Sequence, residues 1–228
     1  MAVEITTTVL DEAVKKVAAH LPARLRTLPD WRISTEANLW RELVASILGS
    51  AVSFEHALRA LLALESAGLT KPPVSTTQYQ EAVEVRLRTA GYRFPRRRAV
   101  HVAETARRVY GTGKNLRTLL IEWKDSKDAR RELVALCMGI GPKQASLFLR
   151  NIGYDELAVL DRHVLAYLQR RSSLGERFAA TSSLDKYECL EEITRENAKR
   201  LSLSVAEFDL AVWVTMRVVN GVQHQWDS

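Results

Sequence analysis

The stretch "MGIGPKQASLFLRN", from Met138 to Asn151, places two glycines, a proline and a lysine directly before an amphipathic run. Gly139 and Gly141 can adopt a positive φ and allow close backbone approach, and Pro142 suits the first position of a helix. The pattern predicts a tight turn between a helix that ends near Cys137 and a helix that begins near Pro142. Such a turn exposes N–H groups at a helix N-terminus, which favours phosphate binding. An ordinary corner between two helices is the alternative.

Lys143 occupies the first turn of the second helix, where the helix dipole disfavours a cation. The dipole and partial burial both favour the neutral amine, which is a nucleophile that can form a Schiff base. A simple contact with phosphate is the alternative role. Eighteen residues later, Asp161 precedes an apolar helical run. An N-cap is the ordinary role of such an aspartate, although a capping carboxylate can also face a cleft.

Helical periodicity extends over nearly the whole chain, and no strand-like alternation or long repeat is visible. The sequence therefore predicts an all-α protein with two helical lobes and a cleft between them. We expect the N- and C-terminal helices to form one lobe and the middle helices the other. The candidate helices lie in Leu39–Leu48, Phe54–Leu69, Phe94–Gly111, Asp125–Cys137 and Ser204–Gly221.

The composition favours a polyanionic partner. The 228 residues are 46% hydrophobic, enough for a sizeable core, and carry a net charge of +6. A merely basic protein is the alternative. Cys137 and Cys189 cannot build a disulfide framework or a thiolate cluster, and the histidines show no metal-ligand spacing with them. No signal peptide or membrane-length apolar run is visible, so we expect a cytoplasmic protein without a metal centre or membrane contact.

A helix–hairpin–helix with Gly-x-Gly-x-Lys and a following aspartate resembles the DNA glycosylase superfamily that contains endonuclease III and the 8-oxoguanine glycosylases. The stretches that narrow the match are "GYRFPRRRAVHVAETAR" (Gly91–Arg107), "GIGPKQASLFLRNIGYDELAVLDRHVL" (Gly139–Leu165) and "FDLAVWVTMRVVNGV" (Phe208–Val222). They resemble the second class of 8-oxoguanine DNA glycosylase/lyases, found mainly in archaea and some bacteria. The resemblance implies one glycosylase unit over residues 1–228, with a DNA-binding cleft between its two lobes and the helix–hairpin–helix at about 126–152.

The resemblance also implies a mechanism. Lys143 matches the nucleophile that attacks C1′ of the damaged nucleoside, expels the base and nicks the strand by β-elimination. Asp161 matches the carboxylate that assists departure of the base and stabilises the cationic sugar. The target base must leave the stack to be reached.

Further residues match the base pocket and the phosphate contacts of that family. Arg93 matches the arginine that reads the orphaned cytosine, while Phe94 and Trp213 match the aromatics on the two faces of the flipped base. A core position is the alternative for Trp213. Gly139 and Gly141 belong to the phosphate-binding hairpin. The arginines expected to hold further phosphates, or alternatively to form a solvated face, are Arg96, Arg97 and Arg98.

This chain departs from the family at two places. Ala51 stands where the family has an asparagine that enters the gap left by the flipped base, and alanine has no amide. Val222 stands where the family commonly has a C-terminal lysine, and the chain continues through "QHQWDS" to Ser228. Both departures concern base recognition.

Three functions follow as hypotheses. The first is a bifunctional glycosylase/AP lyase that excises 8-oxoguanine from duplex DNA. The second is the same fold with an altered base specificity, for example in defence against foreign DNA. The third is a non-catalytic module that binds DNA through the hairpin. For the first we expect a nucleoid-associated monomer that needs no cofactor, with a monovalent cation held at the hairpin as in many members of the family.

Overall fold

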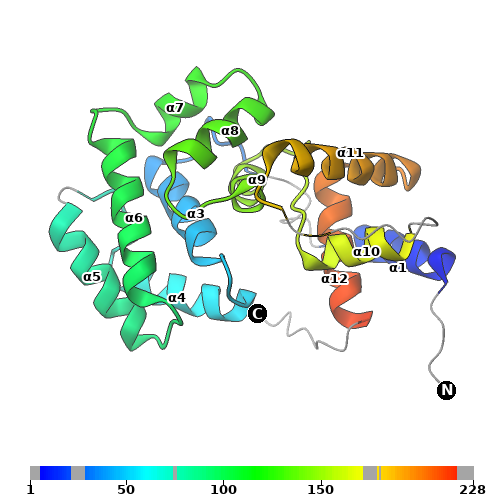
Figure 1. The fold of residues 1–228 in the computed structure, drawn as a ribbon, viewed down its shortest axis with the longest axis horizontal. Helices are drawn as coiled ribbons and strands as arrows, with labels where there is room; N and C mark the ends of the chain where they lie inside the picture. The colour runs from blue at the N-terminus through cyan, green and yellow to red at the C-terminus, as the bar shows by residue number, and fades with distance from the viewer. Residues whose placement is uncertain (1–5, 22–28, 74–75, 172–178, 180, 220–228) are drawn as a thin grey trace. The chain divides into compact units, whose positions relative to one another are not determined.

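The computed structural model describes residues 6–21, 29–73, 76–171, 179 and 181–219. Every regular element in these segments is a helix, which confirms the all-α prediction (Figure 1). None of the helices in the described segments has the length and apolar character that crossing a bilayer requires. The helices are α1 (Thr7–His20), α3 (Glu36–Leu48), α4 (Phe54–Ser66), α5 (Thr76–Thr89), α6 (Pro95–Tyr110), α7 (Leu116–Glu122), α8 (Ser126–Leu136), α9 (Pro142–Asn151), α10 (Arg162–Arg171), α11 (Leu184–Arg200) and α12 (Val205–Val219).

The chain divides into two compact units. Unit 1 consists of Met1–Leu28 and Asp155–Ser228 and contains α1 and α10 to α12. Unit 2 is the continuous segment Pro29–Tyr154 and contains α3 to α9. Unit 1 is therefore built from the two ends of the chain, and unit 2 from its middle.

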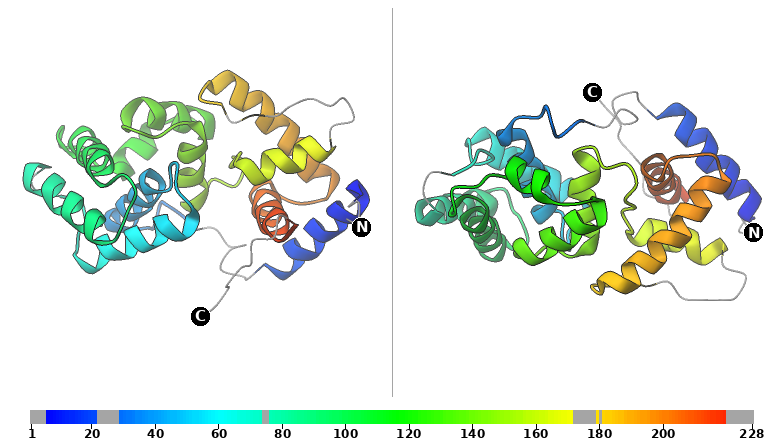
Figure 2. Two further views of the ribbon diagram at one scale, coloured as in Figure 1. Left: turned by 60° about the horizontal axis from the view of Figure 1, so that its bottom comes forward. Right: turned by 90° about the horizontal axis from the view of Figure 1, so that it is seen from above.

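The core of unit 1 forms around α12. Both α1 and α10 pack against this helix, and Figure 2 shows α1 beside it. Leu10 and Val14, four residues apart on α1, share one buried apolar cluster with Phe208 and Val212 of α12. Burial of each large apolar side chain contributes about 1.5–3 kcal/mol. The N-terminal helix is thus bound to the C-terminal one by apolar packing.

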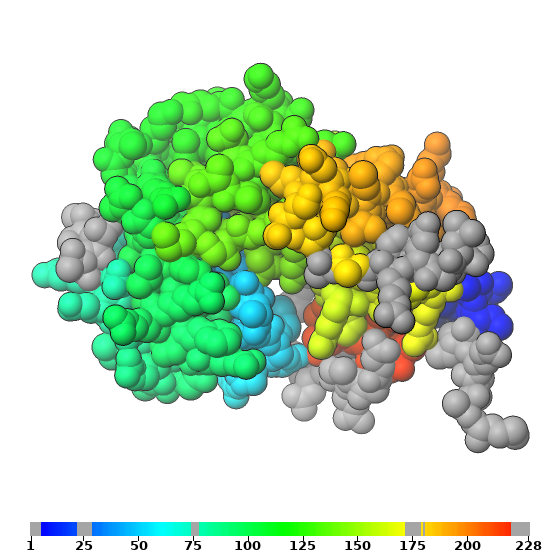
Figure 3. All heavy atoms as spheres, viewed as in Figure 1, coloured from blue at the N-terminus to red at the C-terminus, as the bar shows by residue number. Residues whose placement is uncertain are grey.

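The core of unit 2 forms around α3, which contacts α4, α6, α7 and α9. Leu39, Trp40 and Leu43 are completely buried on this helix. The indole Nε1 of Trp40 donates a hydrogen bond to the hydroxyl of Tyr79 on α5 at 3.2 Å. Helix α6 packs along α5, and the atoms of this part of unit 2 form a continuous surface in Figure 3. Through its contacts, α3 joins α9, the helix that follows the hairpin, to the rest of unit 2.

Candidate active site

The hairpin connects α8, whose C-cap is Cys137, to α9, which begins at Pro142, so the predicted helix boundaries are confirmed. Gly139 has a φ of +77°, and an ideal Cβ there would lie 2.0 Å from Nδ1 of His101. Backbone conformation and close packing both require glycine at this position. Gly141 differs from the expectation, because its φ is −104° and a Cβ there would meet nothing within 4 Å. It serves as the extended N-cap of α9.

One face of α6 supports the hairpin. The buried Thr105 accepts a hydrogen bond from the N–H of Met138 at 3.2 Å, and the buried His101 packs against Gly139. Nη1 of Arg98 donates to Nδ1 of His101 at 3.1 Å. Because a guanidinium can only donate, His101 accepts as a neutral ring. Its pKa is lowered by burial and by neighbouring arginine charges, which agrees with that state.

Lys143 is the second residue of α9 and is half-buried. The carbonyl of Gly141 accepts the N–H of Ala145 at 3.0 Å, so the lysine lies in the first helical turn, as predicted. The next residue, Gln144, is buried and donates to the carbonyl of Ser46 at 2.9 Å. This bond anchors the start of α9 to the end of α3. The neutral state of the Lys143 amine stays a prediction.

Asp161 lies in unit 1, directly before α10. Its Oδ1 accepts hydrogen bonds from the N–H groups of His163 at 2.8 Å and Val164 at 2.9 Å. The aspartate is therefore the N-cap of this helix, and its side chain is half-buried. The cap holds one carboxylate oxygen in place. None of the hydrogen bonds within the described segments involves Oδ2, so that oxygen can face a developing positive charge.

The segment before Asp161 is held by buried side chains that the sequence pattern did not indicate. Three consecutive N–H groups each donate to a side chain that is at most 1% exposed. These acceptors are Glu191 for Ala158 at 2.9 Å, Asp209 for Val159 at 2.8 Å and Tyr187 for Leu160 at 3.0 Å. An acidic residue at a core-facing helix position, such as Asp209 beside Phe208, is the sequence signal that could have found them.

The predicted base-pocket residues lie in both units. Arg93 is exposed in unit 2, and its guanidinium carbon lies 5.0 Å from the ring centroid of Phe94, the half-buried N-cap of α6. Trp213 is on α12 in unit 1, half-buried, with the guanidinium carbon of Arg217 at 4.6 Å from its ring centroid. It is not part of the buried apolar cluster of unit 1. Stacking on a flipped base stays a prediction for both aromatics.

The arginine run at the start of α6 separates into two environments. Arg96 and Arg97 are exposed, as a contact with phosphate requires. Arg98 is only 5% exposed, and its Nη2 donates to the carbonyl of Ser50 at 2.6 Å. The predicted phosphate role of Arg98 is therefore wrong for this structure, because helix periodicity turns the third arginine into the interior of unit 2.

Ala51 lies in the turn between α3 and α4, residues 49–53, and its side chain is exposed. Its φ is +62°, which is unusual for a residue other than glycine or asparagine. Ser53 closes the turn as the N-cap of α4, accepting from the N–H of His56 at 3.3 Å. Val222, the other departure from the family, lies outside the described residues.

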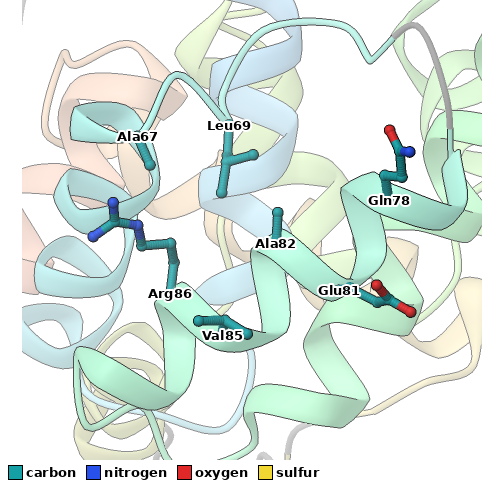
Figure 4. A pocket seen from close by; sticks show the side chains of 7 residues that line it. All are labelled: Ala67, Leu69, Gln78, Glu81, Ala82, Val85 and Arg86. Atoms are coloured by element: carbon teal, nitrogen blue, oxygen red, sulfur yellow. The ribbon is translucent and has the colours of Figure 1, made fainter.

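A hollow on unit 2 lies apart from these residues. It has a volume of about 500 Å³ and is open to solvent between the end of α4 and α5 (Figure 4). Its lining is Ala67, Leu69, Gln78, Glu81, Ala82, Val85 and Arg86. None of the predicted site residues contributes to it.

The comparisons with known proteins agree on one family. A family model described as 8-oxoguanine DNA glycosylase matches residues 23–203. The "8-oxoguanine DNA glycosylase/AP lyase" of Methanocaldococcus jannaschii is 32% identical over 190 residues, which cover 83% of this chain and 86% of that protein. The protein of the same name from Saccharolobus solfataricus is 32% identical over 200 residues, covering 87% and 91%.

A solved structure with bound DNA is also similar. The M. jannaschii 8-oxoguanine glycosylase/lyase, in complex with a 15mer DNA containing 8-oxoguanine, matches with a TM-score of 0.76 at 27% identity, covering 94% of this chain and 99% of that one. The family model spans well over half of the chain, and both curated relatives exceed 30% identity over most of their length. The chain belongs to the 8-oxoguanine DNA glycosylase family.

Proposed function

We propose that the chain is a bifunctional DNA glycosylase and AP lyase that removes 8-oxoguanine from double-stranded DNA. The observation that carries this proposal is Lys143 in the first turn of α9, directly after the hairpin, in a member of this family. The relatives from M. jannaschii and S. solfataricus carry this activity in their names. Because its substrate is chromosomal DNA, we place its action at the nucleoid.

The first step replaces the bond between sugar and base by a bond between sugar and lysine. Nζ of Lys143 donates its lone pair to C1′ of the flipped nucleotide, and the C1′–N9 bond breaks. The base leaves with the electron pair of the broken C1′–N9 bond, and it takes up a proton while the nitrogen attached to C1′ loses one. The sugar is cationic in the transition state, and the carboxylate of Asp161 lowers its energy electrostatically. Only the unprotonated amine has the lone pair that this step needs.

The second step cuts the strand. The C1′–O4′ bond of the adduct then breaks and O4′ takes up a proton. This leaves a Schiff base between Nζ and C1′, which makes the proton at C2′ acidic. Loss of that proton and breakage of the C3′–O bond release the 3′ phosphate by β-elimination. Water then hydrolyses the Schiff base and frees Lys143 for another turnover.

The surrounding residues hold the substrate in this proposal. Phe94 and Trp213 stack on the flipped base, at about 1–3 kcal/mol per stacked face, and Arg93 contacts the orphaned cytosine. Arg96 and Arg97 neutralise phosphates without reading sequence. The N–H groups at the start of α9 bind a further phosphate.

A monovalent cation at the hairpin is part of the same proposal. The carbonyl oxygens of Met138, Gly139 and Ile140 accept no hydrogen bond from within the described segments. Carbonyl oxygens are suitable ligands for a hard cation, so these three residues fit such an ion. When bound, it would supply positive charge for a DNA phosphate, and the chemistry above requires no other cofactor.

A second candidate function follows from Ala51. Because its methyl group cannot form the hydrogen bonds of an asparagine amide, recognition of the opposite base differs in this chain. The same lysine chemistry would then act on a different modified purine. A panel of substrates separates this candidate from the first, since activity on a single non-oxidised base would favour it.

The test is covalent trapping with borohydride on duplexes that carry 8-oxoguanine opposite cytosine or other modified purines. We expect a trapped complex for the wild type and none for Lys143→Gln, whereas Lys124→Gln, a change at an exposed lysine, should be trapped normally. Asp161→Asn should slow excision by about 10²- to 10³-fold. Replacing K⁺ by tetramethylammonium at equal ionic strength should weaken DNA binding.

Two results would contradict the proposal. Undiminished trapping of Lys143→Gln would assign the nucleophile to another residue. If no substrate in the panel is trapped, and salt-sensitive DNA binding is the same for Asp161→Asn as for the wild type, the chain is a non-catalytic DNA-binding module.

A further inference from the structure

The turn between α3 and α4 is held by buried donors from elsewhere in unit 2. The last carbonyls of a helix have no partner within the helix itself. Here the carbonyl of Ser46 accepts from Gln144 at 2.9 Å, that of Leu48 from the hydroxyl of Tyr92 at 2.5 Å, and that of Ser50 from Arg98 at 2.6 Å. All three donor side chains are at most 5% exposed. Their bonds reach every second carbonyl up to the residue before Ala51.

Arg98 links this turn to the hairpin. Its Nη2 bonds to Ser50 of the turn, and its Nη1 bonds to His101, whose ring packs against Gly139. A guanidinium presents its donors in a rigid fork, so both partners are held in a fixed relation. The Tyr92 hydroxyl supports the same turn, and burial raises its pKa, which keeps it a donor.

The turn carries backbone strain that needs such support. A left-handed conformation at a residue other than glycine costs of order 1–3 kcal/mol and persists where the surroundings determine it. Ala51 adopts this conformation with an exposed side chain, and Phe54 beyond it is 57% exposed. Tyr92 and Arg98, which hold the turn, flank the exposed cations Arg93, Arg96 and Arg97. A rigid apolar tip beside basic side chains suits insertion into an opened duplex.

We infer that Arg98 is a positioning residue, which fixes the turn of residues 49–53 against the hairpin so that its tip meets DNA where the target base leaves the stack. This inference rests on the proposed glycosylase function. Arg98 itself contacts no phosphate. Removal of its side chain frees the turn, so extrusion of a base becomes harder while the lysine chemistry is retained. An abasic site has no base to extrude, so its cleavage depends less on the turn.

The experiment compares Arg98→Met and Arg98→Lys with the wild type in four measurements. Hydrogen exchange of the amides of residues 48–54 should become faster in both variants. The maximal rate of 8-oxoguanine excision from duplex DNA should fall by about tenfold or more, while cleavage of a preformed abasic duplex stays within about threefold. The slope of log K against log salt should not change.

Two matched controls lie on the same helix. Arg97→Met removes an exposed charge and should reduce the salt slope by about 0.9, whereas Arg97→Lys should retain it. Arg107→Met, at a side chain 60% exposed and bound to Glu104, should leave all four measurements unchanged. If the Arg98 variants fold poorly, Tyr92→Phe removes the hydroxyl that donates to Leu48 and interacts with Arg98, leaves the guanidinium in place, and should give a smaller loss of the same kind.

Other outcomes would contradict either the role inferred for Arg98 or the proposed function. A salt slope reduced by about 0.9 in Arg98→Met, with slow exchange in the turn, would make Arg98 a phosphate ligand and overturn the inference. Equal losses of excision and abasic cleavage would show a merely structural role. A wild-type protein that excises no base would contradict the proposed function instead, and exchange together with the salt slope would still decide the role of Arg98.

Discussion

At the scale of single residues, Ala51 and Gly139 both have positive φ, at +62° and +77°. Gly139 has no side chain and adopts this conformation at little steric cost, whereas Ala51 carries a Cβ that crowds its own backbone. The strain at Ala51 is therefore local, and substitution can remove it. Because the side chain is exposed, such a substitution need not disturb the core.

We predict that Ala51→Gly and Ala51→Asn raise the free energy of unfolding by about 0.5–1 kcal/mol, since both residues tolerate the left-handed region. Ala51→Val should lower it by about 1 kcal/mol or more, because a β-branched side chain fits this region worst. Thermal denaturation of the wild type and the three Ala51 variants checks this order of stabilities. Ala63→Gly, the same chemical change inside α4, is the matched control and should destabilise by about 1 kcal/mol. A stabilisation at Ala63 or a loss at Ala51 would contradict the assignment.

The arginine run shows what the sequence could and could not predict at this scale. The run of three consecutive arginines by itself indicates only that these side chains bind an anion or face water. The environment of each depends on which face of α6 packs against the hairpin, and that is decided by segments distant in the sequence. Arg98 contacts Ser50, 48 positions earlier. Its neighbours Arg96 and Arg97 remain at the surface, as predicted.

At the scale of elements, the hairpin was predictable because its signals are local. Glycine and proline restrict the backbone at their own positions, so the end of α8 and the start of α9 follow from a few residues. The support of Asp161 was not predictable in the same way. Its preceding segment depends on Glu191 and Asp209, 33 and 50 positions from their partners. Buried carboxylates of this kind are recognised only when the helix faces are known.

Helix α1 is joined to α10 and α11 by the side chain of Asp11. It accepts from the hydroxyl of Tyr167 at 2.5 Å, from Arg171 at 2.7 Å and from Arg200 at 2.6 Å and 3.1 Å, and is only 13% exposed. Burial by itself raises the pKa of Asp11. The hydrogen bonds from Arg200 and Tyr167 and the charges of the two arginines outweigh burial and lower the pKa below 3.8.

The lowered pKa of Asp11 predicts that the free energy of unfolding depends on pH. A carboxylate with a lower pKa in the folded state stabilises the fold above its unfolded pKa and loses that contribution as the pH falls through the folded value. Asp11→Asn should cost about 2 kcal/mol at pH 7, and the difference from the wild type should shrink as the pH falls below about 4. Urea denaturation between pH 7 and pH 2 measures this difference in the free energy of unfolding. Glu12→Gln, at the exposed neighbouring position, should have little effect, and a constant difference for Asp11→Asn would contradict the ion-pair explanation.

At the scale of the whole molecule, the net charge is unevenly divided. Unit 2 has 20 Lys and Arg against 12 Asp and Glu, a net charge of +8, whereas unit 1 has 13 against 15, a net charge of −2. The total of +6 predicts an anionic partner, but the division between units becomes visible only when the ends of the chain are known to fold together. Attraction to the DNA backbone therefore belongs mainly to unit 2.

The salt dependence of DNA binding tests this division. Each neutralised phosphate contributes about −0.9 to the slope of log K against log salt for duplex DNA. Replacing Arg96 and Arg97 of unit 2 by glutamine should therefore reduce the slope by about 1.8. The same removal of two exposed charges from unit 1, at Lys15 and Lys16 on α1, should leave it nearly unchanged. Fluorescence anisotropy over a series of KCl concentrations measures both slopes. Equal reductions in the two double variants would show that attraction follows total charge, and that the charge of unit 2 has no special role in holding DNA.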